Sequence, residues 1–270
     1  MLYLLIILFF ALGLAVGSFL NVVAYRTVHG GSVFLGSSVC PRCKHKLTPL
    51  DLIPIVSFLL LAGKCRYCGK KISLQYPLVE VTTGILFVFT FLYWLNTAYS
   101  IQHTLFVLTS LIYLLFVVSV LIVLFVTDIL DGVLPNSVVL PAIAFVLILK
   151  SIFLVNGDIT LSSLIIDVAA AIVVASAFFT IVYFSNEKAM GGGDVKLAFL
   201  VSLVVGWPAT ILALFVSFLT GAFVAVMLIL LGKKRFGQTV PFGPFLVIGA
   251  FLALFWGREI IEIYLRFLYT

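Results

Sequence analysis

Long apolar runs separated by short polar segments dominate the chain. A helix needs about 20 apolar residues to cross a bilayer, and most of the runs reach that length. They fall at residues 2–25, 76–97, 104–127, 135–155, 161–184, 194–207, 208–231 and 242–268. The sixth run is short, and Gly206 and Pro208 predict a tight turn after it rather than one long helix. The pattern predicts an all-α polytopic membrane protein with about eight transmembrane helices.

Composition supports a membrane protein rather than a soluble one. The chain has 270 residues, of which 64% are hydrophobic and 10% charged, and its mean hydropathy is +1.32. A soluble core cannot bury that much apolar surface, whereas a bilayer can. The first run lacks a basic flank and a clear A-x-A cleavage site, so we expect it to be a retained span rather than a signal peptide.

The distribution of basic residues predicts the orientation. With eight spans, residues 26–75, 185–196 and 232–241 fall on one side and carry 13 of the 16 Lys and Arg residues. The positive-inside rule makes that side cytoplasmic and places both termini outside. Orientation alone accounts for the net charge of +6, so we expect no nucleic-acid partner.

Residues 26–75 form the only sizeable segment outside the predicted membrane helices, and they contain every cysteine. The cysteines form two C-x-x-C pairs, Cys40 with Cys43 and Cys65 with Cys68. Two such pairs can bring four thiolates to one Zn²⁺ in a tetrahedral, zinc-ribbon-like site. Disulfides or a redox pair are the alternative, but a reducing cytoplasm disfavours stable disulfides. A structural metal would stabilise a segment with few apolar core residues.

Acidic residues in or beside apolar spans are costly and therefore candidates for function. The predicted topology places Asp128 and Asp194 at the cytoplasmic ends of their helices, where they can meet. The others in or beside the spans are Glu80, Asp131, Asp167 and Glu187.

Two carboxylates in close contact share a proton and can activate a water while protonating a leaving group. That chemistry fits aspartyl hydrolysis of a peptide bond. The glycines Gly191, Gly192 and Gly193 before Asp194 allow a neighbouring backbone to approach closely.

Other interpretations of these acids remain open on chemistry alone. A transporter could use intramembrane carboxylates as a proton path. Asp131 lies one helical turn after Asp128 and is its rival, although it looks like a helix cap. We expect Asp167 to pair with a polar group of another helix rather than to take part in catalysis. Glu80 could serve either the carboxylate site or the cysteine site.

Several motifs in a fixed order resemble the type IV prepilin peptidases, the bifunctional leader peptidase and N-methyltransferase family of GxGD-type intramembrane aspartyl proteases. They are GSFLNVVAYR (17–26), the paired C-x-x-C, LIPIVSFLLLAGKCRYC (52–68), YPLVE (76–80), TDILDGVLPN (127–136), GGGDVKL (191–197) and PFGPFL (241–246). The resemblance runs nearly end to end.

The resemblance implies specific roles for individual residues. Asp128 and Asp194 match the catalytic aspartates, with Gly191, Gly192, Gly193 and Lys196 in the active-site loop. Asp131 falls at a position that the family varies. Asn136 stands where the family often has Asp, outside the catalytic pair. The segment 241–246 either makes a re-entry turn or borders the cleft.

The resemblance also implies substrates, cofactors and location. It implies cleavage of the basic leader from type IV prepilins or pseudopilins at the cytoplasmic face of the bacterial inner membrane. N-methylation of the new N-terminus by S-adenosylmethionine is implied as well, without an assigned donor site. The predicted organisation is a first helix (1–25), a cytoplasmic four-cysteine loop associated with methyl transfer (26–75) and a seven-helix peptidase domain (76–270).

Overall fold

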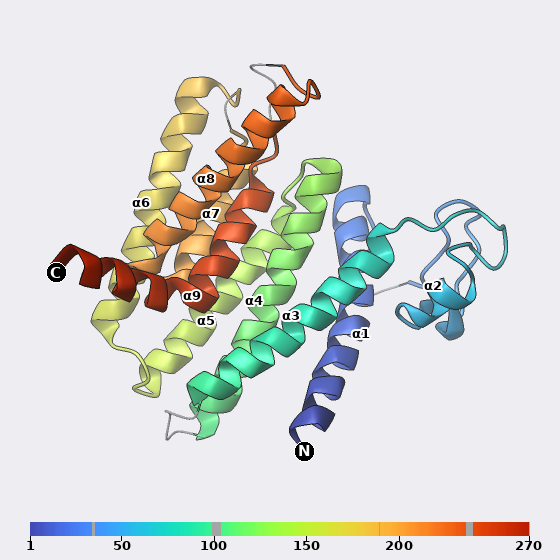
Figure 1. The fold of residues 1–270 in the computed structure, drawn as a ribbon, viewed down its shortest axis with the longest axis horizontal. Helices are drawn as coiled ribbons and strands as arrows, with labels where there is room; N and C mark the ends of the chain where they lie inside the picture. The colour runs from blue at the N-terminus through green and yellow to red at the C-terminus, as the bar shows by residue number, and fades with distance from the viewer. Residues whose placement is uncertain (34–35, 99–103, 189, 236–239, 270) are drawn as a thin grey trace. The chain divides into compact units, whose positions relative to one another are not determined.

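The computed structural model describes residues 1–33, 36–98, 104–188, 190–235 and 240–269, and those residues are nearly all helical (Figure 1). Helices α1 (Leu2–His29), α3 (Gln75–Ala98), α4 (Thr104–Asp131), α5 (Asn136–Val155) and α6 (Leu161–Ser185) are followed by α7 (Gly192–Val205), α8 (Ala209–Leu230) and α9 (Gly243–Tyr269). The short elements η1 (Pro49–Leu52) and α2 (Val56–Leu60) lie in the cysteine loop. The all-α prediction is therefore confirmed.

Within the described residues, seven helices are long and apolar enough to cross a membrane: α1, α3, α4, α5, α6, α8 and α9. The remaining predicted segment forms α7, which has 14 residues and is about 21 Å long. It is shorter than the hydrocarbon core of a bilayer, which is about 30 Å thick. Helices α7 and α8 are separate, as the glycine and proline between them predicted.

The chain divides into two compact units, residues 1–123 and 124–270. In the first unit, α1 packs along α3 through small residues. A Cβ on Gly13 would lie 2.7 Å from the Cα of Gly84, and one on Gly17 would lie 2.8 Å from the Cα of Glu80. Such close backbone approach is how transmembrane helices gain packing energy without a hydrophobic driving force.

The second unit is built around α7. This helix contacts α5, α6, α8 and α9 (Figure 1). Apart from Asp194, Lys196 and Ser202 its side chains are apolar, and Leu197, Ala198, Val201 and Leu203 are fully buried. A helix that is hydrophobic all round belongs in an interior, so α7 is the core of this unit rather than a lipid-facing span.

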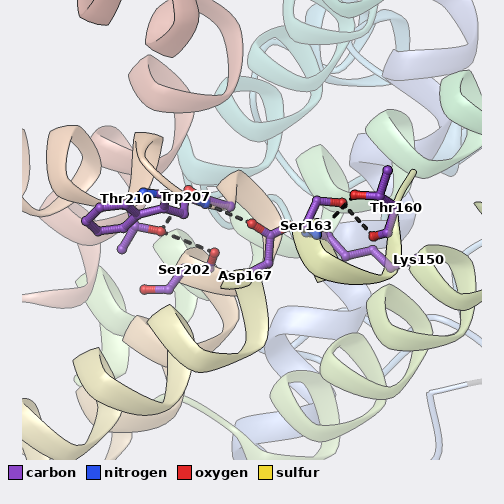
Figure 2. Close-up of polar contacts among 8 residues, drawn as sticks. Lys150, Thr160, Ser163, Asp167, Ser202, Trp207 and Thr210 are labelled. Carbon is purple, nitrogen blue, oxygen red and sulfur yellow. Dashed lines mark hydrogen bonds and ion pairs between the residues drawn. The ribbon is translucent and has the colours of Figure 1, made fainter. Parts of the chain in front are cut away.

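Asp167 of α6 fixes the C-terminal end of α7 (Figure 2). Its Oδ1 accepts a hydrogen bond of 2.9 Å from the amide of Trp207, and its Oδ2 lies 2.6 Å from Nζ of Lys150 on α5. Gly206 has a φ of 70°, and a Cβ there would lie 2.7 Å from Asp167 Oδ1. The expected pairing of Asp167 with a polar group of another helix is confirmed.

Replacing Asp167 by Ala should destabilise the second unit. The Lys150 ammonium and the Trp207 amide would lose their acceptor, and removing one partner of a largely buried ion pair leaves the other charge uncompensated. The thermal unfolding midpoint in detergent should fall markedly. The double variant with Asp167→Asn and Lys150→Met removes both charges but keeps an acceptor for the Trp207 amide. Its unfolding midpoint should therefore be closer to that of the wild type. An unchanged midpoint for Asp167→Ala would contradict this account of the turn.

Candidate active site and cysteine cluster

The first candidate catalytic carboxyl, Asp128, lies in the last turn of α4 and is only 5% exposed. Its Oδ2 is buried and has no hydrogen-bond partner. Gly243, the first residue of α9, lies against it: a Cβ there would be 2.5 Å from Asp128 Oδ2. Only glycine leaves room for the carboxyl at this point. In the segment 241–246, residues 243–246 therefore form the start of α9, and Gly243 borders Asp128.

The second candidate carboxyl, Asp194, caps the start of α7. Its Oδ2 accepts a hydrogen bond of 3.2 Å from the amide of Gly191, which is the N-cap residue. The amide of Asp194 in turn donates to the carbonyl of Gly191 at 3.1 Å. A carboxylate in the first turn is favoured by the helix dipole. This cap fixes the side chain at the N-terminal end of the buried helix.

Asp128 and Asp194 lie within electrostatic range of each other. Both are buried, and Asp194 is 8% exposed. Asp131 is exposed at the end of α4. The structure thus brings together the two acids that the sequence paired, while the rival lies at the surface.

The loop residues around Asp194 hold α7 against the segment before α5. A Cβ on Gly193 would lie 3.2 Å from the Cβ of Leu134, so this glycine allows the close approach. Nζ of Lys196 donates a hydrogen bond of 2.7 Å to Oδ1 of Asn136. Gly192 starts the helix and lies near Glu187. Lys196 thus links α7 to the start of α5, a contact that its spacing from Asp194 could not reveal.

The remaining sequence candidate, Glu80, lies in the other unit and has a different environment. It is 7% exposed, and its Oε2 accepts a hydrogen bond of 2.8 Å from the amide of Ile55 in the cysteine loop. Sequence reasoning could not find this partner, because the contact depends on how the loop folds back on α3.

The four cysteines converge, with their sulfur atoms all within 4.8 Å of one another. A tetrahedral site with Zn–S bonds of about 2.3 Å separates its sulfurs by about 3.8 Å. The donor set therefore fits Zn²⁺ after a small contraction. Within the described residues, no other group of three or more His, Cys, Asp or Glu side chains clusters in this way.

The two C-x-x-C turns have the same backbone pattern. The amide of Cys40 donates to the carbonyl of His45, and that of Lys44 donates back to Cys40, both at 2.9 Å. Cys65 repeats the pattern with Lys70 and Gly69 at 2.8 and 2.9 Å. The two turns therefore hold their pairs of thiols in equivalent local conformations.

The environment of the thiols favours a thiolate at Cys40. Burial acts to raise the pKa of Cys40, but hydrogen bonds from the backbone of Cys43 and Arg42 outweigh it and lower that pKa to about 7. Thiolates rather than thiols bind metal. The amides that lower this pKa belong to the turn itself, so the folded backbone stabilises the thiolate form that binds metal.

Asp51 ties the η1 turn to the second cysteine pair. Its carboxylate accepts from Nε of Arg66 at 2.7 Å and from the hydroxyl of Tyr67 at 3.1 Å. Desolvation acts to raise the pKa of Asp51, yet these donors and the amide and hydroxyl of Thr48 lower it to about 2. Asp51 thus stays ionised at any physiological pH.

This architecture defines a class: a multi-pass helical membrane protein with two adjacent buried carboxyls and a cluster of four cysteines. Two family models match the chain. The Bacterial Peptidase A24 N-terminal domain matches residues 11–94, and the Type IV leader peptidase family matches residues 115–226. The chain belongs to the type IV leader peptidase family.

Curated relatives cover nearly the whole chain. The prepilin leader peptidase/N-methyltransferase of Aeromonas hydrophila is 31% identical over 96% of this chain and 93% of its own length. The protein of that name from Bacillus subtilis (strain 168) is 32% identical over 95% and 96%, respectively. The one from Pseudomonas aeruginosa is 31% identical over 95% and 92%. No solved structure matches the chain significantly.

If the cysteines bind zinc, purified protein should carry about one Zn²⁺ per chain. Replacing Cys40 or Cys65 by Ser should lower the zinc content, because three thiolates hold the metal less tightly than four. Metal analysis of protein purified under reducing conditions makes the test, with Ser37→Ala as an exposed control in the same loop. Freshly reduced wild-type protein without zinc would contradict the assignment.

Proposed function

We propose that the protein removes the basic leader from type IV prepilins or pseudopilins by aspartyl proteolysis. The observation that carries the proposal is the convergence of Asp128 and Asp194 beside Gly243 in the second unit. The names of the relatives supply the substrate class. Family membership supplies the reaction class, because the Type IV leader peptidase match contains both aspartates.

The proposed chemistry uses one proton shared by the two carboxyls. The ionised carboxylate takes a proton from a water molecule, whose oxygen attacks the carbon of the scissile carbonyl. The protonated partner donates a hydrogen bond to the carbonyl oxygen as negative charge develops there. The leaving nitrogen then takes a proton from the carboxyl that accepted one, and the carbon–nitrogen bond breaks.

The proposed orientation places this site at the cytoplasmic face of the bacterial inner membrane. The basic asymmetry of the loops supports it, and both termini are outside if α7 is the eighth crossing helix. A prepilin's charged leader stays in the cytoplasm while its apolar helix lies in the bilayer, so the bond between them meets the carboxyls. A C-terminal reporter found in the cytoplasm would mean that α7 does not cross, whereas a reporter inserted near Asp51 and found outside would overturn the orientation.

N-methylation of the new N-terminus, with S-adenosylmethionine as donor, is the second activity that we propose. It rests on the names of the relatives. The four-cysteine loop is its proposed location, with zinc in a structural role. The described residues mark no donor site, so the chemistry above concerns cleavage alone.

A transporter that uses carboxylates as a proton path is the competing function. It would need exchangeable acids through the depth of the membrane. Asp167 does not suit that role, because both of its oxygens are engaged, with Lys150 and with the amide of Trp207. It also lies against the C-terminal end of α7, whereas Asp194 lies at the N-terminal end. Peptide cleavage therefore fits the arrangement better.

Replacing Asp128 or Asp194 by Asn should lower leader cleavage by about 10⁴-fold or more, because Asn keeps the shape but cannot share a proton. Asp131→Asn and Asn136→Asp are the matched controls and should retain substantial activity. The assay follows shortening of a prepilin in membranes with equal amounts of each variant. Persistent cleavage by either Asn variant would refute the aspartyl mechanism.

Two further variants in the same assay test the Gly243 contact and the separation of cleavage from methylation. Gly243→Ala should also suppress cleavage, because its methyl group would collide with the Asp128 carboxyl. Asp194→Asn should still methylate a synthetic pilin N-terminus that is already processed, if the two activities have separate sites.

A further inference from the structure

The short helix α2 exposes an apolar face that nothing within the described chain covers. Val56, Leu59 and Leu60 are 48%, 69% and 81% exposed. They lie three and four residues apart and so share one side of the helix. Phe58 projects from the opposite side and packs on Gly63, where a Cβ would lie 3.0 Å from the ring. We call Val56, Leu59 and Leu60 the α2 face.

This face is held at the level of the membrane boundary. The amide of Ile55, the N-cap of α2, donates a 2.8 Å hydrogen bond to Oε2 of Glu80. Glu80 is the sixth residue of α3, about 8 Å from the start of that helix. Since α3 is about 36 Å long and the hydrocarbon core about 30 Å thick, about 6 Å of the helix extends beyond the core, and Glu80 lies close to that boundary.

The backbone at the start of α2 is strained, which indicates that contacts elsewhere in the protein hold the helix in place. Ile55 has a φ of 60°, a rare value for a β-branched residue. Such a conformation persists only where the surroundings enforce it. Glu80 provides that constraint through its bond to the Ile55 amide. The α2 face is therefore fixed beside α3 rather than free to fold over the loop.

The charge of the loop is complementary to one kind of surface. Residues 26–75 carry eight Lys and Arg but a single acid, Asp51, which is paired with Arg66. Exposed leucines flanked by basic residues are typical of segments that lie in the interface of an anionic membrane. Leu74 and Leu78, exposed at 65% and 62%, continue the apolar surface onto α3.

We propose that the α2 face inserts into the headgroup boundary of the cytoplasmic leaflet, while the lysines of the loop bind anionic phospholipid headgroups. The docked loop would then lie along the membrane rather than project from it. A basic loop would repel the basic leaders on which the enzyme is proposed to act. Binding of its lysines to anionic lipid headgroups gives this charge a different partner. It does not depend on the proposed proteolysis.

The test places full-length protein in nanodiscs made of phosphatidylcholine alone or of an equal mixture with phosphatidylglycerol. Leu60→Trp adds a fluorophore on the α2 face, and the three native tryptophans provide the baseline. Lipids brominated near the headgroup end of the acyl chain should quench the added emission strongly in anionic discs. Quenching should be weaker in neutral discs, and iodide in the buffer should have little effect.

Two sets of variants make the test specific. Val39, exposed beside Cys40 in the first cysteine turn, provides the matched control: Val39→Trp should respond to iodide instead. Adding Lys70→Gln or Lys71→Gln to Leu60→Trp should lower the ratio of docked to undocked loop by about fivefold each in anionic discs. Neither lysine should matter in neutral discs.

Three outcomes would overturn the proposal. The first is an absence of bromolipid quenching at residue 60, and the second is equal quenching at residues 39 and 60. The third is protection of residue 60 from iodide only after a prepilin is added, because the α2 face would then be a substrate surface.

Discussion

The burial of α7 is the constraint on which the second unit depends. The helix is 14 residues long and largely apolar beyond its first turn, so it is stable only when other helices enclose it. Its polar ends must then be satisfied inside the protein. Gly191 and Asp194 do so at the start, and the turn held by Asp167 and Lys150 does so at the end. The carboxyl of Asp194 thereby has a fixed depth and direction.

The same constraint explains the glycines around the site. Gly193 lets α7 approach Leu134, and Gly243 lets α9 begin directly beside Asp128. An added methyl group at Gly243 would occupy the space of the carboxyl itself. Close packing therefore keeps the buried Oδ2 of Asp128 next to Gly243. Such an oxygen is free to hold a proton or a water molecule.

The sequence predicted most of the helices because apolar runs of membrane length have few alternatives. It also pointed to Asp128 and Asp194, since acids at the ends of apolar runs are costly enough to be conspicuous. It could not predict that α7 is enclosed by four other helices, because a short apolar run looks the same inside a bundle as in lipid. Nor could it predict partners that meet only after folding, such as Glu80 with Ile55 or Asp128 with Gly243. The assignments of Asp128, Asp194 and the zinc ligands remain predictions.

The central claim is that Asp128 and Asp194 form one unit holding one proton. Infrared spectroscopy of the protein in lipid measures this directly, because a protonated carboxyl has a carbonyl stretch that a carboxylate lacks. The account predicts one protonated-carboxyl band near neutral pH that disappears in Asp128→Asn and equally in Asp194→Asn, since neither aspartate alone retains the shared proton. A band that only one substitution removes, or wild-type protein without such a band, would contradict it.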